Sequence, residues 1–331
     1  MRAKTLAPCA LTFGLVLAVA GGALAETPNA GTAPAASFPD WAYPWAPDVK
    51  PPPDDGVPRH VPDSTLSFTV AQERDLFFAP DWHPADHPAM PEIVAHGRKP
   101  EVRACGSCHR AEGTGGPENA SLAGLPAAYI AQQMADFKSG SRKFAGPARS
   151  PETLMIAIAK AAGEAEVESA AAYFSALAPK AIIKVVETDT VPKVEIARVF
   201  YRIAAGGGTE PLGRRIVEVP VDAEQFEHRD SRATFIAYAP IGSIARGEAL
   251  AKAAPSGASG ACVACHGPDL RGVGLVPGVA GRSPSYIVRQ LYDLQQGARA
   301  GSASEPMKSV VAELSPDDMI ALAAYLASLT P

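Results

Sequence analysis

The sequence predicts a mainly α-helical fold of two similar modules, joined by a small β-rich segment and preceded by a proline-rich extension. Residues 105–142 match residues 262–299 without a gap, and twelve of the 38 positions are identical. Apolar residues at helical spacing follow each copy. Val, Ile, Phe and Tyr are enriched between the copies, and fifteen of the 75 residues from 26 to 100 are proline.

The composition describes a chain that can bury a core, and it argues against two classes of partner. Of the 331 residues, 47% are hydrophobic and 20% are charged, and the formal net charge is −5. A nucleic-acid-binding or polybasic membrane-surface protein would carry a basic excess. Beyond the N-terminus, no segment offers the roughly twenty apolar residues that a transmembrane helix needs. We therefore expect no nucleic-acid partner and no transmembrane segment in the mature chain.

Residues 1–25 have the parts of a secretory signal peptide. Arg2 and Lys4 supply the charged start, a short apolar stretch follows, and Ala23-Leu24-Ala25 is a small-residue cleavage site. The apolar stretch is too short for a membrane anchor. The sequence thus predicts an exported protein, and cleavage removes Cys9, one of the five cysteines.

The other four cysteines form two copies of one pattern, in which a histidine directly follows the second cysteine: Cys105-Gly106-Ser107-Cys108-His109 and Cys262-Val263-Ala264-Cys265-His266. Two thiols three residues apart on a helical turn can add to the two vinyl groups of a haem, and the adjacent His can bind the iron. Two disulfides would leave the histidines unexplained, and a zinc site would need another Cys and His spacing. The sequence predicts two covalently bound haem c groups, attached through the four cysteines, with His109 and His266 as iron ligands.

Met155 and Met307 are the candidates for the sixth iron ligand. Each lies 18 residues before a tyrosine of the last helix of its module, Tyr173 or Tyr325. A Met ligand gives a low-spin electron-transfer centre of raised potential, whereas core packing is the alternative for any methionine. The loop-like segment after Pro306 favours Met307 as a ligand, while Met155 can equally lie in a helix and pack in the core.

An iron-bound His also needs an acceptor for its other ring nitrogen, which fixes the tautomer. The carbonyl of Pro277 is the candidate in the second module, and Ala120 is the matching residue in the first.

About three helices are expected in each module from the apolar spacing. Ser315 is a good N-cap for the last helix of the chain. Tyr286–Gln296 and its counterpart Tyr129–Ser139 form another helix, and Gly297 and Gly140 are plausible stops.

Strand-forming residues replace the helical pattern between the modules. We expect a small antiparallel sheet with strands in Ala181–Thr188, Val194–Ile203, Arg215–Val219 and Ala233–Tyr238. The expected domain organisation is a signal peptide (1–25), a Pro-rich extension (26–88), a first haem domain (89–179), a β-rich linker segment (180–243) and a second haem domain (244–331). The extension either wraps the chain's own domains or docks to a partner.

Four further polar residues have less specific interpretations. His83 and His87 have a metal-like spacing, but the proline after each disfavours a helix, so a loop is the better interpretation. Arg142 and Arg299 match across the repeat, and each can pair with a haem propionate or lie on the surface.

Together these residues resemble the dihaem class I cytochromes c of bacterial periplasms, of the cytochrome c-four type. The resemblance rests on the paired motifs, on Pro277-Gly278-Val279-Ala280-Gly281, on the segment 286–299 and on the ending 307–329, which have counterparts in the first module. It implies a class I cytochrome c fold in each haem domain, His/Met ligation of both irons and a periplasmic location. It also implies electron transfer with redox protein partners, such as an oxidoreductase, a dehydrogenase or a terminal oxidase. The segment between the modules is far longer than in that family.

An electron carrier with no substrate chemistry is the leading hypothesis. A cytochrome c subunit of a periplasmic dehydrogenase complex is the close alternative, with the extension and the β-rich segment as its docking surface. A dihaem enzyme, such as a peroxidase or a thiosulfate dehydrogenase, is less consistent with the sequence. Met155 and Met307 would fill the sixth iron positions, and every cysteine of the mature chain is committed to haem attachment.

Overall fold

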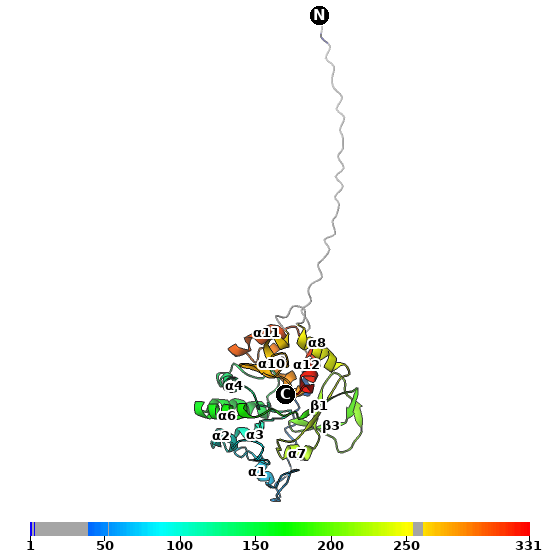
Figure 1. Cartoon of the computed structure of the whole chain (residues 1–331). Helices are drawn as coiled ribbons and strands as arrows, with labels where there is room; N and C mark the ends of the chain where they lie inside the picture. The colour runs from blue at the N-terminus through cyan, green and yellow to red at the C-terminus, as the bar shows by residue number, and fades with distance from the viewer. Residues whose placement is uncertain (2, 4–38, 52, 254–260) are drawn as a thin grey trace. The chain divides into compact units, whose positions relative to one another are not determined.

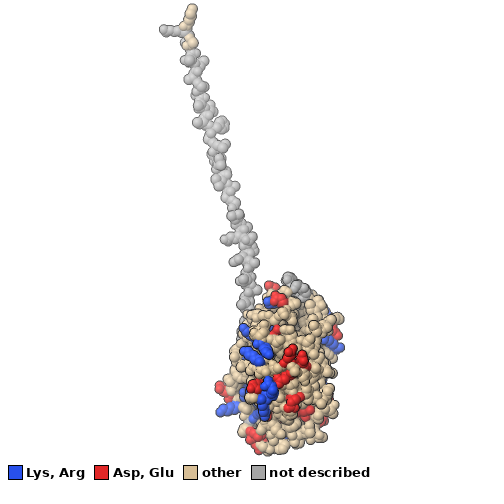
Figure 2. Space-filling view, turned by 90° about the vertical axis from the view of Figure 1, so that its left-hand side faces the viewer, with Lys and Arg blue, Asp and Glu red and all other residues tan. Residues whose placement is uncertain are grey.

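The computed structural model describes residues 1, 3, 39–51, 53–253 and 261–331. Apart from residues 1 and 3, the predicted signal peptide lies outside the described residues. The folded part is mainly helical, with strands gathered on one side of the helices (Figure 1). Acidic and basic side chains share the face shown in Figure 2, in keeping with the small net charge of −5. In the described part of the chain, no helix is long and apolar enough to cross a bilayer.

The first module is built from five helices of the described chain. The longest helices, α4 and α6, pack against each other, and α4 also packs on α5. Gly140 ends α4 with φ of +80°, a left-handed conformation that favours glycine, as expected from the sequence. The helices are α2 (Glu92–Ala95), α3 (Cys105–His109), α4 (Ala127–Ser139), α5 (Ser150–Ala161) and α6 (Glu164–Ala176).

The second module repeats this arrangement. The Ser315 hydroxyl accepts a hydrogen bond from the Asp318 N–H (3.2 Å), so the predicted cap is confirmed. The expected loop around Met307 is wrong, because Pro306 in the first turn starts a short helix there. The elements are α8 (Ser243–Lys252), α9 (Cys262–His266), the hairpin β8 (Gly272–Val273) and β9 (Val276–Pro277), α10 (Pro284–Gln295), the 3₁₀ turn η2 (Ser302–Ser304), α11 (Glu305–Val311) and α12 (Pro316–Ser328).

Between the modules, strands form a three-stranded sheet of order β1-β7-β6 and two small antiparallel pairs, β2 with β5 and β3 with β4. The expected all-antiparallel sheet is wrong, because β1 and β7 pair in parallel. Since β6 pairs with β7 in antiparallel fashion, the three-stranded sheet is mixed. The elements are β1 (Ile183–Glu187), β2 (Thr190–Pro192), β3 (Val194–Ala197), β4 (Phe200–Ile203), β5 (Thr209–Pro211), β6 (Val217–Pro220), α7 (Ala223–Glu227) and β7 (Phe235–Ala239).

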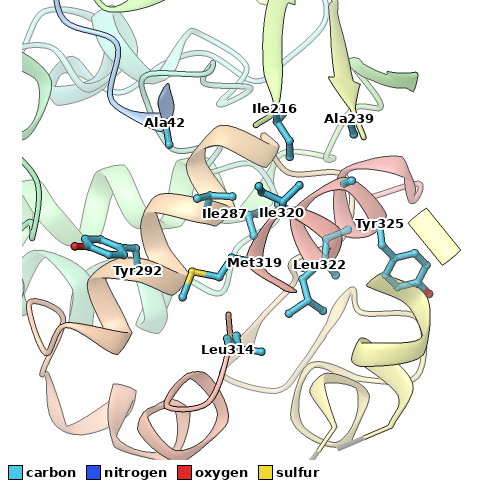
Figure 3. Packing of buried hydrophobic residues seen from close by; sticks show 14 of the residues in the cluster. Ala42, Ile216, Ala239, Ile287, Tyr292, Leu314, Met319, Ile320, Leu322 and Tyr325 are labelled. Carbon is cyan, nitrogen blue, oxygen red and sulfur yellow. The ribbon is translucent and has the colours of Figure 1, made fainter. Parts of the chain in front are cut away.

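The largest core joins three parts of the chain. Most of its residues come from α10 and α12, as Figure 3 shows for Ile287, Met319 and Leu322. Ile216 and Ala239 enter it from the segment between the modules, and Ala42 of η1 (Asp40–Ala42) enters from the extension. The second module therefore depends on residues outside its own repeat for part of its buried apolar surface.

The extension also binds the segment between the modules through a short helix, α1 (Val70–Arg74). Glu73 is buried and its carboxylate lies 2.9 Å from His228 Nδ1. The Trp82 indole N–H donates to the backbone carbonyl of His228 (2.7 Å). These contacts place the described part of the extension against the chain's own domains.

Candidate functional site

One cavity of about 680 Å³ is lined by residues of both modules, and its lining is mainly apolar. The structure brings the two predicted sites together there, although their motifs lie 157 residues apart in the sequence. All of the predicted attachment and ligand residues line this cavity: Cys105, Cys108, His109, Met155, Cys262, Cys265, His266 and Met307.

Both histidines have one ring nitrogen bound to the backbone and the other left for a ligand. His109 Nδ1 lies 2.8 Å from the Ala120 carbonyl oxygen, and His266 Nδ1 lies 2.8 Å from that of Pro277, so both expected acceptors are confirmed. Because a carbonyl can only accept, each Nδ1 carries the proton and each Nε2 keeps its lone pair. Burial lowers the pKa of both histidines, which favours the neutral imidazole that binds iron.

The cysteine pairs lie on single helical turns, α3 and α9, that open into the cavity. None of the four is in a disulfide. Burial raises the pKa of Cys105 to about 12 and also raises that of Cys262, so both thiols are neutral near pH 7. Adjacent thiols, a neutral imidazole and an apolar lining together fit a covalently attached haem in each module.

The two methionines reach the cavity from corresponding helices. Met155 lies on α5, directly before α6, and Met307 lies on α11, directly before α12. Met134, on α4, also lines the cavity and packs against the core of the first module. Met134 thus supplies a control for the effect of a cavity methionine that is not a candidate ligand.

A symmetric hydrogen-bond network joins the modules beside the cavity. Arg142 of the first module donates to Tyr286 Oη (3.1 Å) and Gln290 Oε1 (2.8 Å) of the second. Arg299 of the second module donates to Tyr129 Oη (2.8 Å) and Gln133 Oε1 (2.9 Å) of the first, while the backbones of the two arginines form an antiparallel bridge. The two arginines occupy equivalent positions of the repeat, and so do the two tyrosines and the two glutamines.

This network was not predicted as an interface, although its signal was present. Tyr, Gln and Arg recur at the same places in both copies, on a helix and the turn after it, where apolar packing alone does not require them. Arg142 is 6% exposed, so the surface interpretation of this arginine is wrong. Arg142 is buried because its guanidinium donates hydrogen bonds to residues of both modules, which lie far apart in the sequence.

Residues 42–44 of the extension pass along the same interface. Arg289 of α10 donates to the Ala42 carbonyl (2.8 Å) and to the Pro117 carbonyl of the first module (2.6 Å). Arg149, just before α5, donates to the Pro44 carbonyl (3.2 Å). Tyr43 is buried, and its hydroxyl lies 3.4 Å from Asp293 Oδ1. The extension is therefore tied to both modules next to the cavity.

His83 and His87 do not meet in a metal site. His83 lies 3.2 Å from Asp230, and His87 lies 3.1 Å from Asp81. Among the described residues, no group of three or more His, Cys, Asp or Glu side chains is arranged to hold a metal ion.

Comparison with known proteins shows the family to which the chain belongs. The model of the family Cytochrome c matches residues 244–330, which span α8 to α12. Cytochrome c-554(548) of Halomonas halodenitrificans is 34% identical over 70 residues, which are 21% of this chain and 84% of that protein. The chain belongs to the cytochrome c family.

Longer relatives of this cytochrome match about two thirds of the chain or more. The "Thiosulfate dehydrogenase electron acceptor" of Stutzerimonas stutzeri (strain A1501) is 28% identical over 238 residues, or 70% of this chain and 82% of the relative. Cytochrome c4 of Azotobacter vinelandii is 25% identical over 230 residues, or 68% of this chain and 84% of the relative. The cytochrome is thus related to cytochrome c4, and it is a haem-binding protein of electron transport.

Proposed function

We propose that this cytochrome is a periplasmic dihaem electron carrier with no substrate chemistry of its own. One haem c is attached through Cys105 and Cys108 and the other through Cys262 and Cys265. The observation that carries the proposal is the single cavity, which both Cys-His motifs and both candidate methionines line. Residues 1–25 are the cleaved export signal, and the domain boundaries 26–88, 89–179, 180–243 and 244–331 are part of the proposal.

The chain's residues hold each iron and set its environment. His109 and His266 would hold the iron through Nε2, since Nδ1 of each donates to a carbonyl. Met155 and Met307, which line the same cavity, would supply the second protein ligand of each iron. The haem, when bound, supplies a one-electron change between ferrous and ferric iron. The apolar lining keeps water from the iron and, with a Met ligand, favours a raised potential.

The network of Arg142 and Arg299 would fix the two haem sites relative to each other. Each guanidinium reaches across to the tyrosine and glutamine of the other module. A fixed arrangement lets an electron that enters at one haem pass to the other without a domain movement.

A cytochrome subunit of a periplasmic dehydrogenase complex is the alternative. It is favoured by the relative whose name is a thiosulfate dehydrogenase electron acceptor. In that case the partner is a dehydrogenase, and the protein isolated from its own cells should co-purify with it in a fixed ratio. Isolation as a free chain, reducible by more than one donor, supports the general carrier instead.

The test of the proposed function is the ferric spectrum of the matured protein, with haem counted per chain. Met ligation gives a weak sulfur-to-iron charge-transfer band at long wavelength. We expect two haems per chain and a band of two-haem intensity. Met307→Ala and Met155→Ala should each halve the band and add a high-spin component, whereas the control Met134→Leu should keep it unchanged.

A different result would redirect the assignment. If Met155→Ala leaves the band intact, Met155 is a packing residue, and the first iron has another ligand or an open position. An open position would bring the peroxidase-like enzyme forward.

A further inference from the structure

A small cavity of about 20 Å³ lies where three parts of the chain meet. Its walls come from the first module, from the segment between the modules and from the beginning of the second module's helix α10. Ser121, Arg282 and Tyr286 line this small cavity and also line the large cavity of the two predicted haem sites. The two cavities therefore share a wall.

Glu218 of β6 is a buried acid that lines the small cavity, and it is 1% exposed. Its Oε2 accepts hydrogen bonds from the Ser283 hydroxyl (2.7 Å) and from the Ser285 N–H (3.2 Å), at the beginning of α10. Within the part of the chain that the structure describes, neither Glu218 Oε1 nor Arg282 Nε has a hydrogen-bond partner. A cavity of this volume accommodates about one water molecule, which would give both atoms a partner.

Both protonation states of Glu218 find partners in this arrangement. When the carboxylate is ionised, its Oε2 is held by Ser283 and Ser285 at the N-terminus of α10, where the helix favours an anion. When the acid is protonated on Oε1, Oε2 still accepts both hydrogen bonds, and the O–H can donate to a water molecule in the cavity. The proton can therefore be gained or lost without a movement of α10 or β6.

Opposing effects act on the acidity of Glu218. Burial has the largest effect and raises its pKa, whereas the hydrogen bonds from Ser283 and Ser285 and the positive charge of Arg289 on α10 lower it. Three other titratable side chains line the same small cavity: Lys180, Arg282 and Tyr286. Both forms of the acid thus have specific support.

The other elements packed on β6 are β7, β4 and α7. On β7, the residue paired with Glu218 is the uncharged Ala237. Tyr201 of β4 packs against the cluster of Val217 and Val219, which point to the face of β6 opposite Glu218. The charged residues of β4 and α7 form ion pairs of their own, Arg202 with Glu195 and Glu227, and Glu224 with His228.

Lys180 connects the small cavity with solvent. Its side chain lines the cavity and is 37% exposed. Its ammonium group forms ion pairs with Glu112 and, at 3.6 Å, with Asp86. A proton can reach Glu218 through water on this side, without crossing the large cavity.

We propose that Glu218 is a proton-binding site coupled to the haems, which takes up a proton from water when a haem is reduced and releases it when that haem is oxidised. This inference rests on the proposed function. One electron from a redox protein converts ferric to ferrous iron and removes one positive charge, and the Glu218 carboxylate forms an O–H bond with a proton from solvent. The change in charge acts across the shared wall of the two cavities, where the low dielectric strengthens electrostatic interactions.

The coupling is reciprocal. The factor by which reduction raises the proton affinity of Glu218 equals the factor by which protonation of Glu218 raises the affinity of the haem for its electron. An ionised Glu218 therefore favours ferric iron, and a protonated Glu218 favours reduction.

The test compares the wild-type holoprotein with Glu218→Gln and with the control Glu168→Gln, which removes a carboxylate from an exposed position of α6. Glutamine has the shape of the protonated acid and cannot ionise. Spectroelectrochemistry from about pH 4 to about pH 9 measures the midpoint potentials of both haems in each protein. Infrared difference spectra between the oxidised and reduced forms show whether a protonated carboxylic acid appears on reduction.

At low pH, Glu218 is protonated in both redox states, so the wild type and Glu218→Gln should have the same potentials. At high pH, the equilibrium constant for reduction of the more affected haem should be about fivefold or more lower in the wild type, which is about 40 mV for a one-electron couple. Between these limits, the wild type should show a carboxylic acid band on reduction that Glu218→Gln lacks. Glu168→Gln should follow the wild type within about twofold at every pH.

A difference between the wild type and Glu218→Gln that is the same at every pH, or no difference at any pH, would overturn the proposal. An equal effect in Glu168→Gln would also overturn it. If Glu218→Gln does not give a folded holoprotein, Ser283→Ala provides the test. It removes a donor to the ionised carboxylate, so the pH dependence of the potentials should move to higher pH, and an unmoved dependence would overturn the proposal. Failure of the wild type to bind two haems, or to exchange electrons reversibly, would instead overturn the proposed function.

Discussion

Asp293 is a buried acid at the interface between the modules. Its carboxylate accepts the Ala145 N–H at 2.9 Å and lies 3.4 Å from the Tyr43 hydroxyl. Burial raises its pKa to about 6, against the opposing effects of the Ala145 hydrogen bond and of nearby arginines that include Arg142. A raised pKa in the folded state means that folding favours the protonated acid. The contribution of protonated Asp293 to the free energy of unfolding is fully present at low pH and is lost as the pH rises through about 6.

Asp293→Asn should therefore stabilise the protein only at neutral and higher pH. Asparagine keeps an acceptor for Ala145 and carries no charge. The shift predicts a gain of up to about 3 kcal/mol in the free energy of unfolding near pH 8, falling to about zero near pH 4. Urea unfolding of the holoprotein from about pH 4 to about pH 8 measures this change in the free energy of unfolding. Asp48→Asn, at an exposed position, should stay within about 0.5 kcal/mol throughout, and a pH-independent gain in Asp293→Asn would contradict the argument.

At the scale of elements, the crossing of α8 and α12 depends on one glycine. A Cβ on Gly247 would overlap the Ala321 carbonyl and lie 2.6 Å from the Tyr325 Cβ. The two helices meet backbone to backbone there, and no side-chain rotamer can relieve the overlap. This crossing brings the beginning and the end of the second module together.

Gly247→Ala should force α8 away from α12 and lower the free energy of unfolding by about 3 kcal/mol or more. Gly206→Ala is the control, since nothing lies within 4 Å of a Cβ at that position. Thermal unfolding followed by circular dichroism compares the two variants. Equal melting temperatures for Gly247→Ala and the wild type would show that the helices can separate without cost.

The sequence predicted individual elements better than their pairing. Ser315 and Gly140 act locally on the backbone, so the cap and the helix stop that they form were predicted. The parallel pairing of β1 with β7 was not, because it depends on how the chain crosses between two modules. Met307 was expected in a loop since Pro306 precedes it, yet a proline fits the first turn of a helix equally well.

At the scale of the whole molecule, the arginine network couples the modules. Arg142 donates to Gln133 in its own module and to Tyr286 and Gln290 in the other. Its removal takes a charged donor from Tyr286 Oη and leaves Gln133 Oε1 and Gln290 Oε1 with Arg299 as their donor. Buried hydrogen bonds to charged groups each contribute about 1.5–3 kcal/mol.

Arg142→Ala should therefore lower the free energy of unfolding by about 3 kcal/mol, and it should couple to Tyr286→Phe by more than about 0.5 kcal/mol in a double-mutant cycle. Chemical denaturation of the four holoproteins measures both values. Arg246→Ala removes an exposed ion pair with Asp318 and should cost less than about 1 kcal/mol. Additive effects of the Arg142 and Tyr286 changes would show that the modules are not coupled through this contact.

The sequence by itself predicted the chemistry of each module, because covalent haem attachment needs only Cys, Cys and His on one helical turn. The repeat likewise predicted Met155 and Met307 as a matched pair of candidate ligands. Only the tertiary structure decided that both sites line one cavity and that Arg142 and Arg299 reach across to the opposite module. These features join segments more than a hundred residues apart, and such contacts follow from the packing of whole modules rather than from any local pattern.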